Sequence, residues 1–165
     1  MLKIMPGLAL AVLLAGCQTA ATRNPDSPFY MIPSGSKLVL NREIRIPEKQ
    51  AHVKLQHGRI VGGVDEYTVN CRFTVKDLGP STVKPDTFNI TRAEAQLEWE
   101  MYPSIMRYYR KIYLRSDKQP DVLNLMCQRW DLPYGAVNVS VPDMREAVGE
   151  YFTFELLPPP AQGKP

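Results

Sequence analysis

YTVNCRFTVK, residues 67–76, alternates apolar and polar side chains along its whole length. Successive side chains of a β-strand point to opposite faces, so the alternation predicts a strand whose apolar face includes Cys71 and Phe73. Shorter segments of similar character are separated by Gly and Pro turns, and many short strands at this spacing predict a mostly β protein. We therefore expect a single small antiparallel β-sandwich or barrel-like domain. The further predicted strands are 37–41, 43–46, 51–56, 86–90, 122–130 and 152–156.

Residues 91–101 leave two interpretations open, a helix or a strand. Their first four residues fit a helix capping box, whereas five apolar residues then alternate strictly with polar ones. We expect a strand that pairs with 107–115 in an antiparallel hairpin. The predicted register places Glu98 opposite Lys111, because opposite charges then meet across the two strands.

The C-terminal part of the predicted domain contains its one helix. Val137, Val139 and Val141 alternate with other residues, and Pro142 then opens a short helix over 143–148. Gly149 follows at the position where glycine commonly ends a helix. A short helix near the C-terminus is therefore part of the expected fold.

The composition bounds the class of protein. The chain has 165 residues, of which 44% are apolar and 22% charged, so it can build one ordinary core and is not intrinsically disordered. Its formal net charge of +3, with acids and bases interspersed, is too small to indicate a nucleic-acid partner.

The N-terminus has the layout of an export signal. Lys3 precedes an apolar stretch, 4–16, that is too short for the roughly 20 residues a membrane-spanning helix needs. The stretch ends in Leu14-Ala15-Gly16-Cys17, which resembles the lipobox of bacterial lipoproteins. That resemblance implies cleavage before Cys17 and lipidation of its sulfur. Gln18, in place of an inner-membrane retention Asp, implies the periplasmic face of the outer membrane.

These features divide the chain into four parts. A lipoprotein signal peptide covers 1–16, and the lipidated Cys17 with a flexible tether rich in small and polar residues covers 17–33. The β domain covers 34–157, and a Pro-rich disordered tail covers 158–165.

Cys71 and Cys127 are the two cysteines that lipidation would leave. In an exported chain such a pair indicates a disulfide, and both residues lie on the apolar faces of predicted strands, with Leu123 and Leu125 beside Cys127. We expect the bond to lie in the core. Two buried free thiols, or a redox or metal pair, are the alternatives.

The chain shows little sign of catalytic chemistry. Its only histidines, His52 and His57, are spaced so that a strand would point them to opposite faces, which predicts no metal site. We expect no catalytic residue, no cofactor and no enzyme.

The run 107–115 interleaves tyrosines with cations. This pattern either serves strand pairing or binds an envelope glycan such as peptidoglycan or lipopolysaccharide. The candidate ligand-binding residues are Tyr108, Tyr109, Arg110, Lys111 and Tyr113.

The expected function is that of a non-enzymatic interaction or structural accessory protein of the cell envelope. Its expected partners are the membrane, through the lipid anchor, and an envelope protein of unknown identity, but not nucleic acid. The alternatives are a module that binds an envelope glycan and a lysozyme-inhibitor-like lipoprotein. In architecture the chain resembles small envelope lipoproteins, among them accessory subunits of secretion machines and periplasmic lysozyme inhibitors.

Overall fold

The computed structural model of the protein describes residues 21–134 and 138–158. The predicted signal peptide, the predicted lipidation site Cys17, the first residues of the predicted tether, Val137 and the tail from residue 159 onward lie outside these ranges. Within them the protein is mostly β, with a short C-terminal helix, as the sequence predicts. The strands are β1 (Lys37–Leu40), β2 (Ile44–Ile46), β3 (His52–Gln56), β4 (Arg59–Val61), β5 (Asn70–Val75), β6 (Ser81–Val83), β7 (Asp86–Met101), β8 (Ile105–Arg115), β9 (Val122–Asp131) and β10 (Phe152–Glu155).

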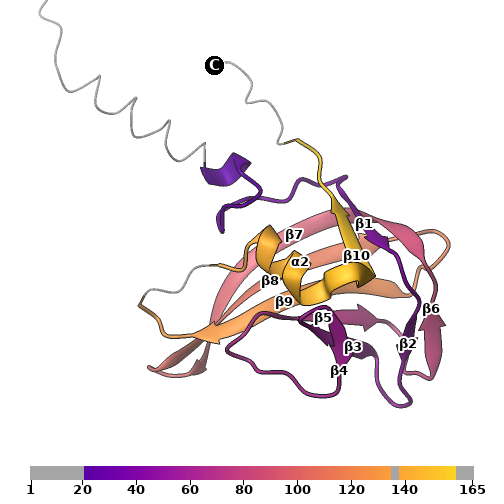
Figure 1. Ribbon diagram of the computed structural model, residues 1–165, viewed down its shortest axis with the longest axis horizontal. Coiled ribbons are helices and arrows are strands. Elements are labelled where there is room, and N and C mark those ends of the chain that lie inside the picture. The colour runs from indigo at the N-terminus through magenta and orange to yellow at the C-terminus, as the bar shows by residue number, and fades with distance from the viewer. Residues whose placement is uncertain (1–20, 135–137, 159–165) are drawn as a thin grey trace, which may run out of the picture.

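Eight strands form one antiparallel sheet in the order β10-β1-β7-β8-β9-β5-β3-β4, and β2 pairs with β6 beside it. The large sheet is curled (Figure 1), and helix α2 (Val141–Val148) packs against β10 from one end of the order and against β3 and β5 from the other. The ring centroids of Phe73 on β5 and Phe152 on β10 are 5.2 Å apart. Strands that are distant in the sheet thus meet across one hydrophobic core, on what we call the inner face.

The sequence specifies both ends of α2. Ser140 forms a reciprocal capping box with Asp143, and proline occupies the first turn, where its missing N–H costs no hydrogen bond. Gly149 ends the helix at φ 54° and lies against Gly58 in the β3–β4 turn, so that an added Cβ would come within 2.5 Å of the Gly58 Cα. The predicted helix is confirmed, and its C-terminal glycine is also required by this close approach.

β7 is one continuous strand of 16 residues, where the sequence predicts two consecutive strands. The strand prediction for 91–101 is confirmed, and the helix alternative is wrong. A bulge between Ile90 and Arg92 inserts one residue into the pairing with β8. Inward-facing positions therefore change from even numbers, such as Phe88 and Ile90, to odd numbers, such as Ala93. The bulge breaks the period of two, so the sequence suggests two separate strands.

The β7–β8 hairpin exists, but its predicted register is wrong. Glu98 lies opposite Arg107 and not Lys111, which itself lies opposite Glu94. The connection is only Tyr102–Ser104, so β8 starts two residues earlier than predicted. The shift is an even number of residues, and each side chain consequently keeps its predicted face.

Two further details of the predicted strands are wrong. β5 begins at Asn70 and not at Tyr67, because the Asp65 carboxylate accepts the Tyr67 N–H at 3.0 Å and holds this stretch in a turn. Leu123 on β9 is exposed although Leu125 is buried. The register between β5 and β9 slips by one residue at this point, and the slip turns Leu123 outward.

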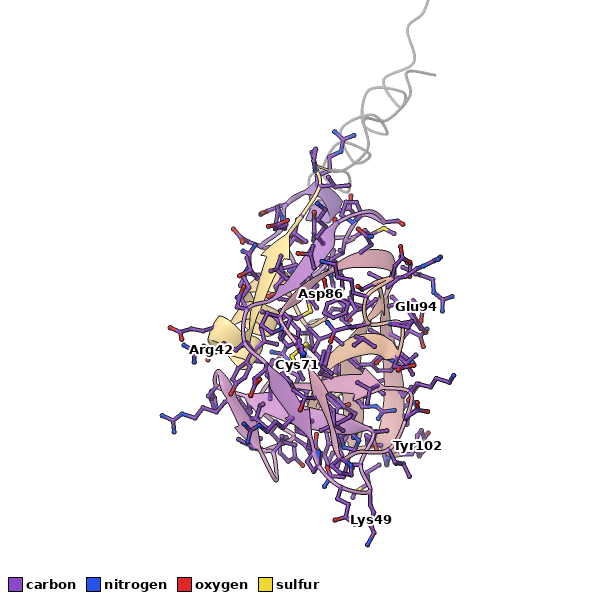
Figure 2. The ribbon with its side chains drawn as sticks, turned by 90° about the vertical axis from the view of Figure 1, so that its right-hand side faces the viewer. Arg42, Lys49, Cys71, Asp86, Glu94 and Tyr102 are labelled. Atoms are coloured by element: carbon purple, nitrogen blue, oxygen red, sulfur yellow. A yellow bond between two sulfur atoms is a disulfide. The ribbon has the colours of Figure 1, made fainter. Side chains whose placement is uncertain are left out.

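The predicted disulfide is confirmed. Cys71 on β5 lies directly opposite Cys127 on β9, with their Cα atoms 3.9 Å apart, and both residues are fully buried in the core. Figure 2 shows Cys71 in the interior of the domain. The bond joins residues 56 positions apart in sequence, so it removes many conformations from the unfolded chain.

Reduction of this bond is expected to lower the free energy of unfolding by about 4 kcal/mol, the chain-entropy value for a closed loop of this length. The measurement is urea denaturation of the mature chain carrying Cys17→Ser, with and without dithiothreitol. Cys71→Ala combined with Cys127→Ala serves as the control and should not respond to the reductant. A loss below about 1 kcal/mol in the disulfide-bonded chain would contradict the assigned role.

Candidate functional site

The structure divides the tyrosine-rich run of β8 between the two faces of the sheet. Tyr108 and Arg110 point to the inner face and are 6% and 3% exposed. Tyr109, Lys111 and Tyr113 lie on the opposite, outer face and are partly exposed. The five candidate ligand-binding residues consequently do not form one surface, because strand alternation separates them.

On the outer face the side chains of β7 and β8 bind one another. Arg107 pairs with Glu98, and its Nε lies 3.0 Å from Glu100 Oε1. The Tyr109 hydroxyl lies 2.7 Å from both Glu98 Oε1 and Gln96 Oε1. The hydrogen bond between the Tyr109 hydroxyl and Glu98 lowers the pKa of Glu98 and raises the pKa of Tyr109.

The aromatic rings of this outer surface are covered by cations. The Arg92 guanidinium lies 4.2 Å from the Tyr113 ring centroid, the Lys111 Nζ lies 5.0 Å from the same centroid, and Arg107 lies 5.2 Å from that of Tyr109. Ring faces that stack sugars or bases must be open. The observed arrangement therefore favours strand pairing as the role of these residues.

Arg110 holds the N-terminal segment against the inner face. Its Nη1 donates to the Tyr30 carbonyl oxygen at 2.7 Å, and its Nη2 donates to that of Pro28 at 3.1 Å. Tyr30 and Ile32 are themselves buried in the core. The packed part of the chain thus begins before Ser34, the residue at which the sequence predicts that the β domain begins.

Arg110 is buried beside a hollow whose lining is mostly apolar but includes Glu94 and Asn138. Burial lowers the pKa of Arg110, and the negative charge of Asp143 acts in the opposite direction. A hollow of about 260 Å³ beside it is lined by Phe29, Met31 and the small side chains of Ala93 and Ala95, among others. The guanidinium therefore joins the N-terminal segment to β8 at the floor of an apolar depression.

Beyond this depression the end of the β7–β8 hairpin, residues 95–109, extends past the core. We call it the hairpin arm. Two inner-face side chains of β7 are strongly exposed, as are Met101 and Tyr102 at the tip, and the rings of Trp99 and Tyr102 make an edge-on contact with centroids 5.1 Å apart. The four exposed fractions are 56% for Leu97, 48% for Trp99, 60% for Met101 and 79% for Tyr102.

The alternating pattern of 91–101 predicts that the apolar β7 residues share one face of a strand, and the sequence gives no indication of a role for Phe29 or Met31. An alternating pattern identifies the face on which a side chain lies, but not whether anything covers that face. The feature that indicates an uncovered face is strand length, because β7 has 16 residues and is longer than either strand that pairs with it.

The arrangement of the described titratable groups differs from the one that a metal site needs. Within residues 21–134 and 138–158, no three His, Cys, Asp or Glu side chains gather as a metal site would need. Burial, reinforced by Arg72 and Lys54, lowers the pKa of His52, and His57 lies in the tight β3–β4 turn at φ 51°. No helix in the described ranges is long and apolar enough to cross a membrane.

Comparison of the chain with protein-family models, with curated proteins and with solved structures finds no match. Any functional assignment must therefore come from the residues and surfaces of this chain itself.

Replacement of Arg110 by Met is expected to release the N-terminal segment, because it keeps an apolar stem but removes both donors to the Pro28 and Tyr30 carbonyls. The loss of about 1.5 kcal/mol of local stability should speed cleavage by chymotrypsin after Phe29 about tenfold. The matched control is Arg107→Met on the outer face, which should leave that cleavage rate unchanged. Equal rates in both variants would show that Arg110 does not hold the segment.

Proposed function

We propose that the protein is a lipid-anchored accessory protein of the outer membrane that binds a protein partner through the apolar surface of the hairpin arm. The observation that carries the proposal is the exposure of Leu97, Trp99, Met101 and Tyr102 together on one projecting hairpin. Exposed apolar clusters are rare on monomeric proteins and mark interaction sites, and aromatic residues contribute most to such contacts.

The arrangement of the chain ends supports this role. Both ends of the described domain lie at the same end of the molecule, and Figure 2 places Tyr102 in the opposite half. A lipid on Cys17 would hold the first end near the membrane, since only a short stretch of chain joins them. The hairpin arm then points toward the periplasm, where a partner can reach it.

Replacement of Cys17 by Ser is expected to move the protein from the membrane fraction to the soluble periplasmic fraction, because the thioether to lipid cannot form. Immunoblotting of fractionated cells measures this, with Thr19→Ser as a control that changes a nearby residue but leaves the Cys17 thiol and the core disulfide. A Cys17→Ser protein that stays in the membrane fraction would contradict lipid anchoring.

The partner itself can be captured with a photo-reactive amino acid at Tyr102 and identified by mass spectrometry. With the purified partner, Trp99→Ala is expected to weaken binding about 30-fold, as for an aromatic residue at the centre of an interface. Leu78→Ala is the matched control, since Leu78 is equally apolar and 68% exposed but lies away from the arm.

The absence of any cross-link at Tyr102 would contradict the proposed function. Equal binding by the Trp99 and Leu78 variants would show that the apolar surface of the arm is not the interface.

A further inference from the structure

The edge of β7 that faces away from β8 is covered over only part of its length. β1 pairs with Asp86–Asn89, and two backbone hydrogen bonds of 2.8 Å, with Gly35 and Ser36, extend this contact to Ile90. From Arg92 to Met101, β7 pairs only with β8 among the described residues. We call these ten residues the open edge. They present a row of backbone N–H and C=O groups without a neighbouring strand.

The open edge lacks most of the features by which proteins block strand addition. Natural edge strands are short, contain Pro, carry bulges along their length or are covered by a helix or loop. β7 contains no Pro, and its two register shifts lie at the ends of the open edge, after Ile90 and after Trp99. From Ala95 to Met101 every residue is exposed. A regular, accessible strand edge is therefore available for pairing.

The two faces of the open edge differ in chemistry. Ala95, Leu97 and Trp99 lie on the inner face and continue the apolar surface of the arm. Glu94, Gln96, Glu98 and Glu100 lie on the outer face. Figure 2 shows Glu94 on the outside of the domain. A strand added here would meet apolar neighbours on one side and mainly carboxylates on the other.

The cations that accompany two of these carboxylates stand on the far side of β7. Arg107 on β8 forms ion pairs with both Glu98 and Glu100, so a single positive charge lies beside two negative charges. Glu94 pairs with Arg92 at 3.0 Å on β7 itself. On the outer face the open edge itself carries three carboxylates and one cation, Arg92, so this part of β7 is net negative, while Lys111 and Arg107 lie on β8, one strand farther from an added strand. Lys or Arg on an added strand would be stabilised directly opposite Glu94, Glu98 or Glu100.

The same charges disfavour a second copy of this chain as the added strand. Antiparallel pairing of two open edges with matching faces places Glu94 opposite Glu98 or opposite Glu100, twice in each pair of chains. The first register also places Arg92 opposite Glu100, which offsets the repulsion, whereas the second has no such compensation. Like charges directly opposite one another destabilise a strand pair. A different chain with a complementary pattern fits better.

We propose that the open edge binds an extended segment of the protein partner by β-strand addition, and that this segment alternates apolar residues with Lys or Arg. The proposal rests on the proposed function, because it specifies the partner segment that the hairpin arm recognises. Backbone hydrogen bonds to β7 hold the segment, and its alternating side chains match the two faces of the arm.

The test uses the mature chain with Cys17→Ser and a ten-residue peptide that alternates valine and lysine. Binding is measured by fluorescence anisotropy, and backbone hydrogen exchange locates the site. The expected result is at least tenfold slower exchange within Arg92–Met101 at saturation. N-methylation of every second peptide nitrogen, or replacement of its lysines by glutamate, should weaken binding at least tenfold.

Two protein variants refine the test. Gln96→Lys adds a positive charge to the outer face of the open edge and should weaken the valine-lysine peptide while strengthening the valine-glutamate peptide. Thr82→Lys is the matched control, because it adds the same charge at an exposed position on β6 and should change neither affinity.

Failure of the valine-lysine peptide to bind, or protection at β4 or β10 instead of β7, would overturn strand addition. Protection of β7 that grows with protein concentration alone, with a dimer in sedimentation, would assign the edge to a second copy and also overturn it. If the cross-link at Tyr102 and the effect of Trp99→Ala persist in either case, the proposed function stands without this mode of binding.

Discussion

The burial of one face of the curled sheet under α2 is the constraint on which the remaining structure depends. The helix contacts strands from both ends of the sheet order, and the Phe73 and Phe152 rings meet across the interior. This closure requires the C-terminal end of α2 to approach the β3–β4 turn, where Gly58 and Gly149 are in contact. The inner face is thus filled where the helix and the N-terminal residues Tyr30 and Ile32 pack on it.

β7 and β8 are longer than the region that this core covers. The outer half of β7 therefore projects with the same alternation of apolar and polar side chains but with its apolar ones exposed, whereas Met106 and Tyr108 on the inner face of β8 are buried. The bulge after Ile90 decides which residues become exposed in this way, since it exchanges the faces of the β7 positions up to Trp99, where a second register shift occurs. One inserted residue thus directs Leu97 and Trp99 to the inner side of the arm.

Much of this fold could be predicted from the sequence, because local patterns encode it. Alternation located most strands, Pro142 and Gly149 indicated the ends of α2, and two cysteines on apolar faces predicted the core disulfide. The hairpin register could not be obtained in this way, because two registers that differ by four residues place the same residues on each face and both pair opposite charges.

The candidate site was harder to predict, since it depends on what covers each face. Leu97 and Trp99 carry the pattern of core residues, and only the limited extent of the neighbouring strands exposes them. Arg110 presents the reverse case. Its charge suggested a surface residue, but it is buried because the carbonyl groups of Pro28 and Tyr30, distant in sequence, accept its hydrogen bonds.

The attachment of the N-terminal segment by Arg110 also limits how the domain can orient. If the lipid is carried by Cys17, only nine residues separate it from Ser27, the first buried residue, and they span at most about 30 Å. Force applied to the lipid would then be transmitted to the middle of β8 by the Arg110 guanidinium, which is hydrogen-bonded to Pro28 and Tyr30. The domain would then stay within a short distance of the membrane, and the hairpin arm would reach only partners close to it.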